Sequence, residues 1–114
     1  MQKIHSTPSL QREYDQLARR VSRLGLISQG SVQDRTHRQR GGAGYQWTRK
    51  VAAKTVTVAL SQEQFSKMRQ AVANYRQLRR LLKRMEQISR SIIFQTAPHT
   101  ARRKRLSPKV LGIM

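Results

Sequence analysis

The sequence of 114 residues contains no cysteine and only five acidic residues. Without cysteine the chain forms no disulfide, no thiolate metal site and no cysteine nucleophile. Hydrophobic residues make up 37% of the chain, below the roughly 45–50% of ordinary domains, which predicts a thin core. No stretch approaches the roughly 20 apolar residues of a membrane span, and the amino terminus lacks the apolar run of a signal peptide. We therefore expect a soluble, cytoplasmic protein that does not contact a membrane.

Side chains for catalysis are equally scarce. A two-metal nuclease needs clustered carboxylates, whereas the acidic residues of this chain are scattered. The three histidines are widely separated, so neither a zinc site nor a general base with an orienting carboxylate is indicated. The acidic residues are Glu13, Asp15, Asp34, Glu63 and Glu86, and the histidines are His5, His37 and His99. We expect no enzymatic activity, no metal and no cofactor.

Positive charge is what the chain has in excess. Its 24 Lys and Arg residues give a formal net charge of +19. The balance is positive within residues 1–25, 26–60, 61–94 and 95–114 alike. A chain this basic repels itself and attracts polyanions, whose displaced counterions favour binding. The charge therefore predicts a nucleic-acid partner.

The first periodic segment predicts a helix. Thr7 before Pro8 resembles an N-cap followed by proline at the first helical position, and Gly25 can end the helix. Glu13 and Asp15 lie toward its positive end. Apolar residues spaced by four and three form one stripe that is typical of a helix–helix seam. They are Leu10, Tyr14, Leu17, Val21 and Leu24.

A loop and a hairpin are expected next. Residues 29–44 combine four glycines with a charged run, which predicts a basic, mobile loop. Its Gly41–Gly44 cluster lacks the Lys-Ser/Thr ending of a P-loop. Residues 45–50 and 55–60 are rich in β-forming residues and predict a β-hairpin, although their connection contains no Gly or Asn.

A long amphipathic helix should follow. Ser61 and Gln64 form a capping box, and an apolar face continues to about Phe94. Its members are Phe65, Met68, Val72, Tyr75, Leu78, Leu82, Met85, Ile88 and Ile92. The first helix and the hairpin can cover only part of this face, so the remainder indicates a homodimer or a partner surface.

Together these elements predict an α+β fold: an N-terminal helix, a basic Gly-rich loop, a β-hairpin, a long C-terminal amphipathic helix and a basic disordered tail. We expect an N-terminal arm at residues 1–8, one small domain at 9–94 and the tail at 95–114.

The candidate nucleic-acid contacts lie in the loop, the hairpin, the long helix and the tail. On the long helix five cations recur at steps of seven, four, three and seven, which places them on one stripe. Tyr45 and Trp47 alternate with Arg49 in a strand, where an exposed ring could stack on an unpaired base. The alternative is that Trp47 anchors the hairpin to the long helix and leaves Tyr45 as the more exposed ring. Candidate contacts are Arg35, Arg38, Arg40, Tyr45, Arg49, Lys50, Arg69, Arg76, Arg80, Lys83, Arg90, Arg102, Arg103, Lys104 and Arg105.

Readout of base edges needs rigidly held polar side chains in a groove. Asn74, Gln77 and Gln87 are present on the long helix, but surface amides are common in any helix. Recognition of charge or shape is the better-supported expectation.

The segment from Gly30 to Ser89 resembles a small bacterial family of domains of unknown function found beside transposases and other mobile elements. The resemblance covers roughly half of the chain. It rests on Gly30–Val32, Gly44–Thr48, Lys54–Thr57, Leu60-Ser61 with Glu63-Gln64, Ala73–Arg76, and Met85-Glu86 followed by Ser89. It implies a helix, loop, hairpin and long helix in a mobile-element setting.

Typical members of that family carry a Cys-Gly-Lys-Pro-x-Cys-x-Cys motif, which suggests metal binding. In this chain the corresponding stretch, Arg35–Gly42, has arginines and glycines instead. No metal role is transferred.

The leading hypothesis is a non-enzymatic accessory protein that binds nucleic-acid phosphates, alone or in a larger nuclease or transposase complex. A structural RNA-binding component of a ribonucleoprotein agrees equally well with the composition. A third hypothesis is a dimeric protein-interaction module formed through the apolar helix faces.

Overall fold

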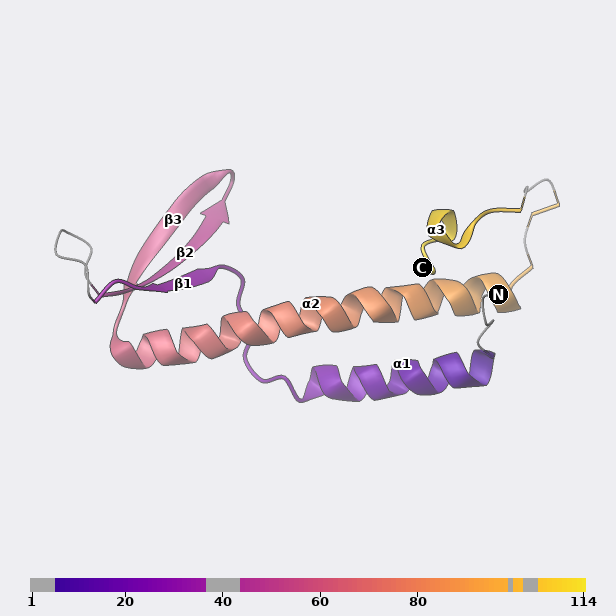
Figure 1. The fold of residues 1–114 in the computed structure, drawn as a ribbon, viewed down its shortest axis with the longest axis horizontal. Helices are drawn as coiled ribbons and strands as arrows, with labels where there is room; N and C mark the ends of the chain where they lie inside the picture. Colours follow the sequence, from indigo (N-terminus) through magenta and orange to yellow (C-terminus); the bar gives the residue numbers. More distant parts are fainter. Residues whose placement is uncertain (1–5, 37–43, 99, 102–104) are drawn as a thin grey trace. The chain divides into compact units, whose positions relative to one another are not determined.

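The computed structural model describes residues 6–36, 44–98, 100–101 and 105–114 (Figure 1). The predicted α+β class is confirmed. Its elements are α1 (Thr7–Ser22), β1 (Ser31–Asp34), β2 (Tyr45–Val51), β3 (Lys54–Leu60), α2 (Gln62–Thr96) and α3 (Pro108–Leu111). The chain divides into two compact units, and α2 contributes to both. The helical unit comprises Met1–Arg23 and Arg79–Met114, and the sheet unit comprises Leu24–Leu78.

Helix α1 begins one residue earlier than expected. Ser6, with extended backbone, is the N-cap, and its hydroxyl accepts a hydrogen bond from the Ser9 amide at 3.3 Å. Thr7, the expected cap, is the first helical residue, and its hydroxyl donates to Gln95 Oε1 of α2 at 3.2 Å. Pro8 keeps its expected place in the first turn, where no intrahelical donor is needed. The boundary of the expected arm therefore falls within α1.

Helix α2 confirms the capping box. The Gln64 amide donates to Ser61 Oγ at 3.1 Å, and the Gln64 side chain accepts from the Ser61 amide at 2.9 Å. The helix extends to Thr96, two residues beyond the expected end of its apolar face. Because both capping partners lie within four residues of each other, the start of α2 is determined by local sequence.

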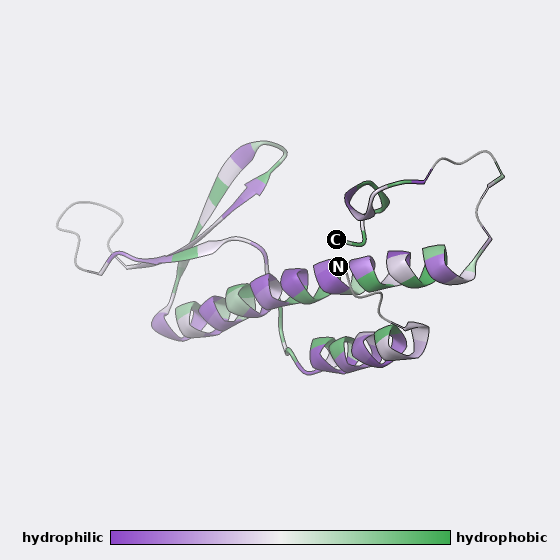
Figure 2. Cartoon of the chain, turned by 45° about the vertical axis from the view of Figure 1, so that its right-hand side comes forward, coloured by the Kyte–Doolittle hydropathy of each residue, from purple (hydrophilic) through white to green (hydrophobic). Residues whose placement is uncertain are grey.

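In the helical unit, α1 runs antiparallel to the second half of α2, and apolar residues alternate with polar ones along both helices (Figure 2). Leu10 and Leu17 of α1 are buried together with Leu81 and Ile88 of α2. The expected stripe of α1 is therefore confirmed at two of its positions. On α2, however, Leu81 takes the buried position, while Leu82 is 43% exposed. The expected face is otherwise confirmed at Val72 and Ile88, which are both buried, so the prediction is wrong only at Leu82.

The sheet unit contains a three-stranded antiparallel sheet of order β1-β2-β3. The expected hairpin is present as β2 and β3, but residues 31–34, expected in the loop, form the additional strand β1. Val32 pairs with Trp47 across the two strands. Four residues with a single Val give no strand pattern, so β1 depends on its pairing with β2. Arg38, Arg40 and Gly41–Ala43 of the expected loop lie outside the described residues.

Tyr45 joins the sheet to α2 through an aromatic contact. The Tyr45 ring stacks against Phe65 with ring centroids 4.5 Å apart. Tyr45 and Trp47 are both half-buried. Trp47 instead donates its indole N–H to the Gln29 carbonyl at 2.9 Å.

Polar contacts hold the segment before β1 against α2. Asn74 donates its amide to the Leu26 carbonyl at 2.9 Å, and the Ser28 amide donates to the Ala71 carbonyl at 3.1 Å. Ala71 and Val72 are the buried apolar residues of this unit. A core this small leaves much of the packing to hydrogen bonds.

The expected disordered tail contains one ordered turn. Ser107 caps α3 by accepting from the Val110 amide at 3.3 Å, and Gly112 ends it with φ +73°. The Gly112 carbonyl accepts from Arg90 Nη1 at 3.2 Å, so α2 contacts the segment that follows α3. Caps on a four-residue segment give no periodic pattern, which is why the sequence did not indicate this helix.

The turn between β2 and β3 is strained. Ala52 and Ala53 have φ of +49° and +65°, a pair of values that favours Asn-Gly because a Cβ is disfavoured in this region. Replacing both residues, Ala52→Asn with Ala53→Gly, should therefore raise the free energy of unfolding by about 1 kcal/mol or more. Urea denaturation followed by circular dichroism measures the change.

The matched control is Ala73→Gly in α2, an exposed helical position of the same unit. There glycine should lower stability by about 1 kcal/mol. A turn variant no more stable than the parent protein would contradict the assigned turn.

Candidate nucleic-acid interface

All five carboxylates of the chain lie in the described residues, and each has a partner nearby. Glu13 pairs with Arg84, Glu63 with Lys67, and Glu86 with Arg90. Asp15 accepts from Gln11, and Asp34 accepts from the amide and hydroxyl of Thr36. With 24 cationic residues in the chain, these five carboxylates can balance only a small part of the positive charge.

The pair Glu13–Arg84 joins the two helices of the helical unit. Arg84 Nε and Nη2 donate to the two Glu13 oxygens at 2.7 and 2.8 Å, with side chains 38% and 40% exposed. This two-bond geometry is the favourable one for arginine and carboxylate. The hydrogen bonds from Arg84 to Glu13 raise the pKa of the guanidinium above its ordinary value. Glu13, expected to be a helix-end charge, is instead an interhelical partner, and sequence reasoning did not single out Arg84.

We expect Glu13→Gln to lower the free energy of unfolding by about 1 kcal/mol, because Arg84 loses its charged partner in a half-buried place. Glu63→Gln is the control: its pair with Lys67 is exposed and should contribute within ~0.5 kcal/mol. Chemical denaturation of both variants measures the difference. Equal losses would contradict a structural role for the interhelical pair.

The pH dependence of this pair follows from the raised pKa of Arg84. A raised folded-state pKa gives stability that is present below the ordinary arginine pKa and lost only as pH rises through the folded value. Deprotonation of Arg84 therefore removes none of this stabilisation near neutral pH.

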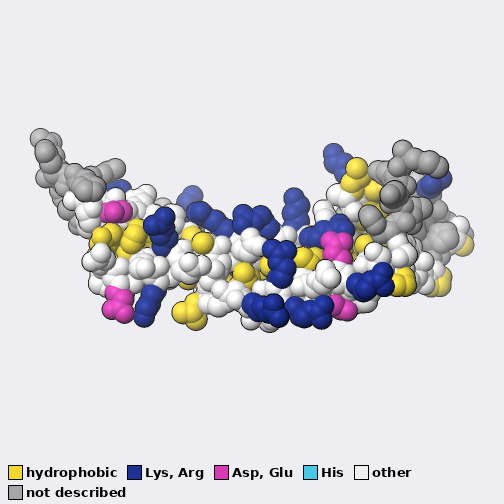
Figure 3. Space-filling model, turned by 60° about the horizontal axis from the view of Figure 1, so that its bottom comes forward, with side chains coloured by type: hydrophobic (Ala, Val, Ile, Leu, Met, Phe, Trp, Pro, Cys, Tyr) yellow, Lys and Arg dark blue, Asp and Glu magenta, His cyan; other side chains and the backbone are white. Residues whose placement is uncertain are grey.

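All five cations of the expected α2 stripe are exposed. Arg69 and Arg76 belong to the sheet unit, and Arg80, Lys83 and Arg90 to the helical unit. Arg90 is the most restrained of the last three, because it bonds the Gly112 carbonyl and lies 4.0 Å from Glu86. On the face drawn in Figure 3, Lys and Arg side chains outnumber Asp and Glu and project outward.

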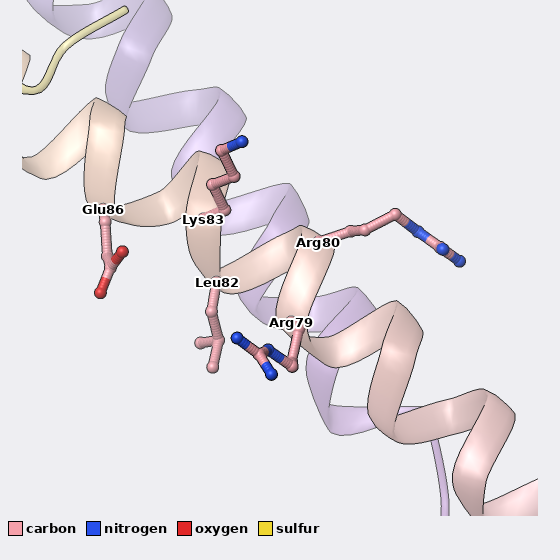
Figure 4. A pocket seen from close by; sticks show the side chains of 5 residues that line it. All are labelled: Arg79, Arg80, Leu82, Lys83 and Glu86. Atoms are coloured by element: carbon pink, nitrogen blue, oxygen red, sulfur yellow. The ribbon is translucent and has the colours of Figure 1, made fainter. Parts of the chain in front are cut away.

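Arg80 and Lys83 line an open depression of about 440 Å³ with Arg79, Leu82 and Glu86. Sequence reasoning missed Arg79, although it directly precedes Arg80. Figure 4 shows the three cationic side chains leaving α2 in different directions rather than converging on one point. This arrangement suits contacts with several phosphates better than enclosure of one small anion.

The sheet separates two candidate residues that are adjacent in sequence. Arg49 places its guanidinium carbon 5.1 Å from the centroid of the Trp47 ring, on the same face of the strand. Lys50, next in the strand, points to the opposite face. Arg35 is half-buried and donates to Gln33 Oε1 at 3.1 Å. Arg49 and Lys50 are exposed.

In the tail, Arg105 is exposed. Arg102, Arg103 and Lys104 lie outside the described residues, as do Arg38 and Arg40 of the loop. The expectation that these five residues contact nucleic acid stays a prediction.

In the described part of the chain, no three His, Asp or Glu side chains come together as a metal site would require. None of the described helices combines the length and hydrophobicity needed to cross a membrane.

Comparisons with protein-family models, with curated proteins and with solved structures find no match to this chain.

Proposed function

We propose that this protein is a non-enzymatic nucleic-acid-binding accessory protein that contacts the phosphate backbone. The observation that carries the proposal is the group Arg79, Arg80 and Lys83, exposed together on two turns of α2. Glu86, the carboxylate that lines the same depression, lies 4.0 Å from Arg90. All three side chains are exposed, so phosphates of a nucleic acid can reach them.

The spread of these cations favours binding along a backbone. Side chains that diverge from one helix can each contact a different phosphate, and each contact releases condensed counterions. Phosphate contacts position a nucleic acid but read no sequence. Asn74, which could have read a base edge, bonds the Leu26 carbonyl and accepts from Gln70 instead. Recognition by the α2 cations is thus proposed to depend on charge.

A salt titration tests the proposal. Binding to a duplex should weaken steeply as salt rises, with a log–log slope of about −0.9 per neutralised phosphate, and about −0.7 on single strands. Fluorescence anisotropy of a labelled oligonucleotide gives the slope. A flat salt response would contradict phosphate binding.

Site-directed variants test the location. Neutralising Arg79, Arg80 and Lys83 together to Gln should reduce the magnitude of the slope on duplex DNA by about 2 to 3. The matched control replaces Arg12, Arg19 and Arg20 of α1 with Gln, which removes the same charge from exposed positions outside the proposed site. An equal reduction of the salt slope in the two triple variants would show that total charge, rather than this part of α2, controls binding.

The setting in a mobile-element complex rests on the family resemblance alone and stays a prediction. Purifying the protein from its host, treating parallel samples with RNase or DNase and sequencing what remains bound identifies the partner. Recovery of structured RNA would favour the ribonucleoprotein alternative.

A further inference from the structure

One face of the sheet remains open beyond its contact with α2. The register pairs Tyr45 with Leu60, Trp47 with Val58 and Arg49 with Val56, and side chains of paired residues share a face. Phe65 covers the Tyr45 end of this face. Figure 1 shows β2 and β3 leading away from α2 towards their turn.

The exposure of the strand residues increases from the end near α2 towards the turn between β2 and β3. β2 is half-buried from Tyr45 to Thr48 and exposed from Arg49 onward, and in β3 every residue except Leu60 is exposed. Val56 and Val58 are 37% and 41% exposed. In the described part of the chain, Arg49, Val56 and Val58 are thus exposed beside the half-buried Trp47.

Trp47 is held in a fixed position on this face. Its indole N–H donates to the Gln29 carbonyl at 2.9 Å. Gly30, with φ +109°, passes so close that a Cβ there would overlap the indole nitrogen. Arg49 lies over the ring, 5.1 Å from its centroid. Tryptophan and guanidinium therefore form a layered, preorganised pair, since a guanidinium plane stacks well on an aromatic ring.

Cations predominate around this pair, and the carboxylate of the sheet, Asp34, pairs with Tyr45 at the end of this face that Phe65 covers. Residues 45–60 contain Arg49, Lys50 and Lys54 and no carboxylate. Lys54 pairs with Val51, which places it on the same face as Arg49. This face thus combines planar groups, apolar side chains and cations, the combination that binds unpaired bases together with their phosphates.

We propose that the face formed by Trp47, Arg49, Lys54, Val56 and Val58 binds single-stranded nucleic acid, with an unpaired base stacked on the Trp47–Arg49 pair and a neighbouring phosphate at Lys54. This rests on the proposed nucleic-acid-binding function and deepens it. Bases in a duplex are stacked on one another and offer only their edges in the grooves. A planar stacking surface therefore selects for unpaired bases, whereas the α2 cations do not.

The single tryptophan of the chain, Trp47, reports directly on this face. The full-length protein is titrated with an oligothymidylate of about ten nucleotides, a length in the range of single-strand binding sites, and with a duplex of equal phosphate number. Trp47 emission should be quenched by the single strand and should change little with the duplex. The proposal would be overturned if Trp47 emission changed equally with the single strand and the duplex, or did not change with the single strand.

Two neighbouring variants separate stacking from charge. Arg49→Gln and Lys50→Gln remove the same charge from opposite faces of β2. Single-strand affinity should fall ~10-fold for Arg49→Gln, in the range reported for lost base stacking, and only ~2-fold for Lys50→Gln. Arg49→Lys, which keeps the charge but not the plane, should lower affinity several-fold and leave the salt slope unchanged. Equal effects of the two Gln variants would overturn the stacking assignment.

The failures of the two proposals are distinguishable. Salt-sensitive binding without quenching of Trp47 and without a specific effect of Arg49 would leave the phosphate-binding function intact and remove the stacking site. No binding to any nucleic acid would remove both. Two measurements without nucleic acid test whether a second copy of the protein covers this face: light scattering gives the mass, and Trp47 emission is followed as protein concentration rises. Emission that changes with protein concentration together with a dimeric mass would show a second copy on this face, contrary to the proposal.

Discussion

The shortage of carboxylates is the constraint on which the rest of the structure depends. Five acidic residues face 24 basic ones, and each of the five has a partner within the protein; Glu13, Glu63 and Glu86 each pair with a cation. The strongest by geometry, Glu13 with Arg84, joins α1 to α2. The carboxylates thus take part in contacts within the protein. The remaining positive charge repels itself, which is why the proposed partner is a polyanion.

This constraint also accounts for how little the chain buries. A thin core keeps the cations at the surface, and only six hydrophobic residues are buried in the described part of the chain. In the sheet unit these are Ala71 and Val72 alone. Hydrogen bonds such as Asn74 to the Leu26 carbonyl supplement the packing there. Sheet positions such as Val56 and Val58, which a larger domain would cover, stay open to a partner.

The sequence predicted those features whose partners lie close together in the chain. The capping box of Ser61 and Gln64 and the apolar spacing of α1 are local, and both are present. β1 was missed because it depends on pairing with β2. On α2, Val72 and Ile88 are buried as predicted, and only Leu82 was misassigned, because Leu81 and Leu82 fit the period almost equally. The Tyr45–Phe65 stack and the Glu13–Arg84 pair join distant segments, which no single-sequence pattern indicates.

The candidate site also has some features that local sequence predicts and others that depend on distant segments of the chain. Exposure of the α2 cations follows from a helical period that the sequence displays, so Arg69, Arg76, Arg80 and Lys83 could be proposed before their positions were known. The separation of Arg49 from Lys50 also follows from strand alternation. What the sequence could not supply is the position of Trp47 beneath Arg49, because that depends on Gln29 and Gly30. Charge alone attracts any nucleic acid, whereas the proposed preference for unpaired bases depends on this fixed, layered pair.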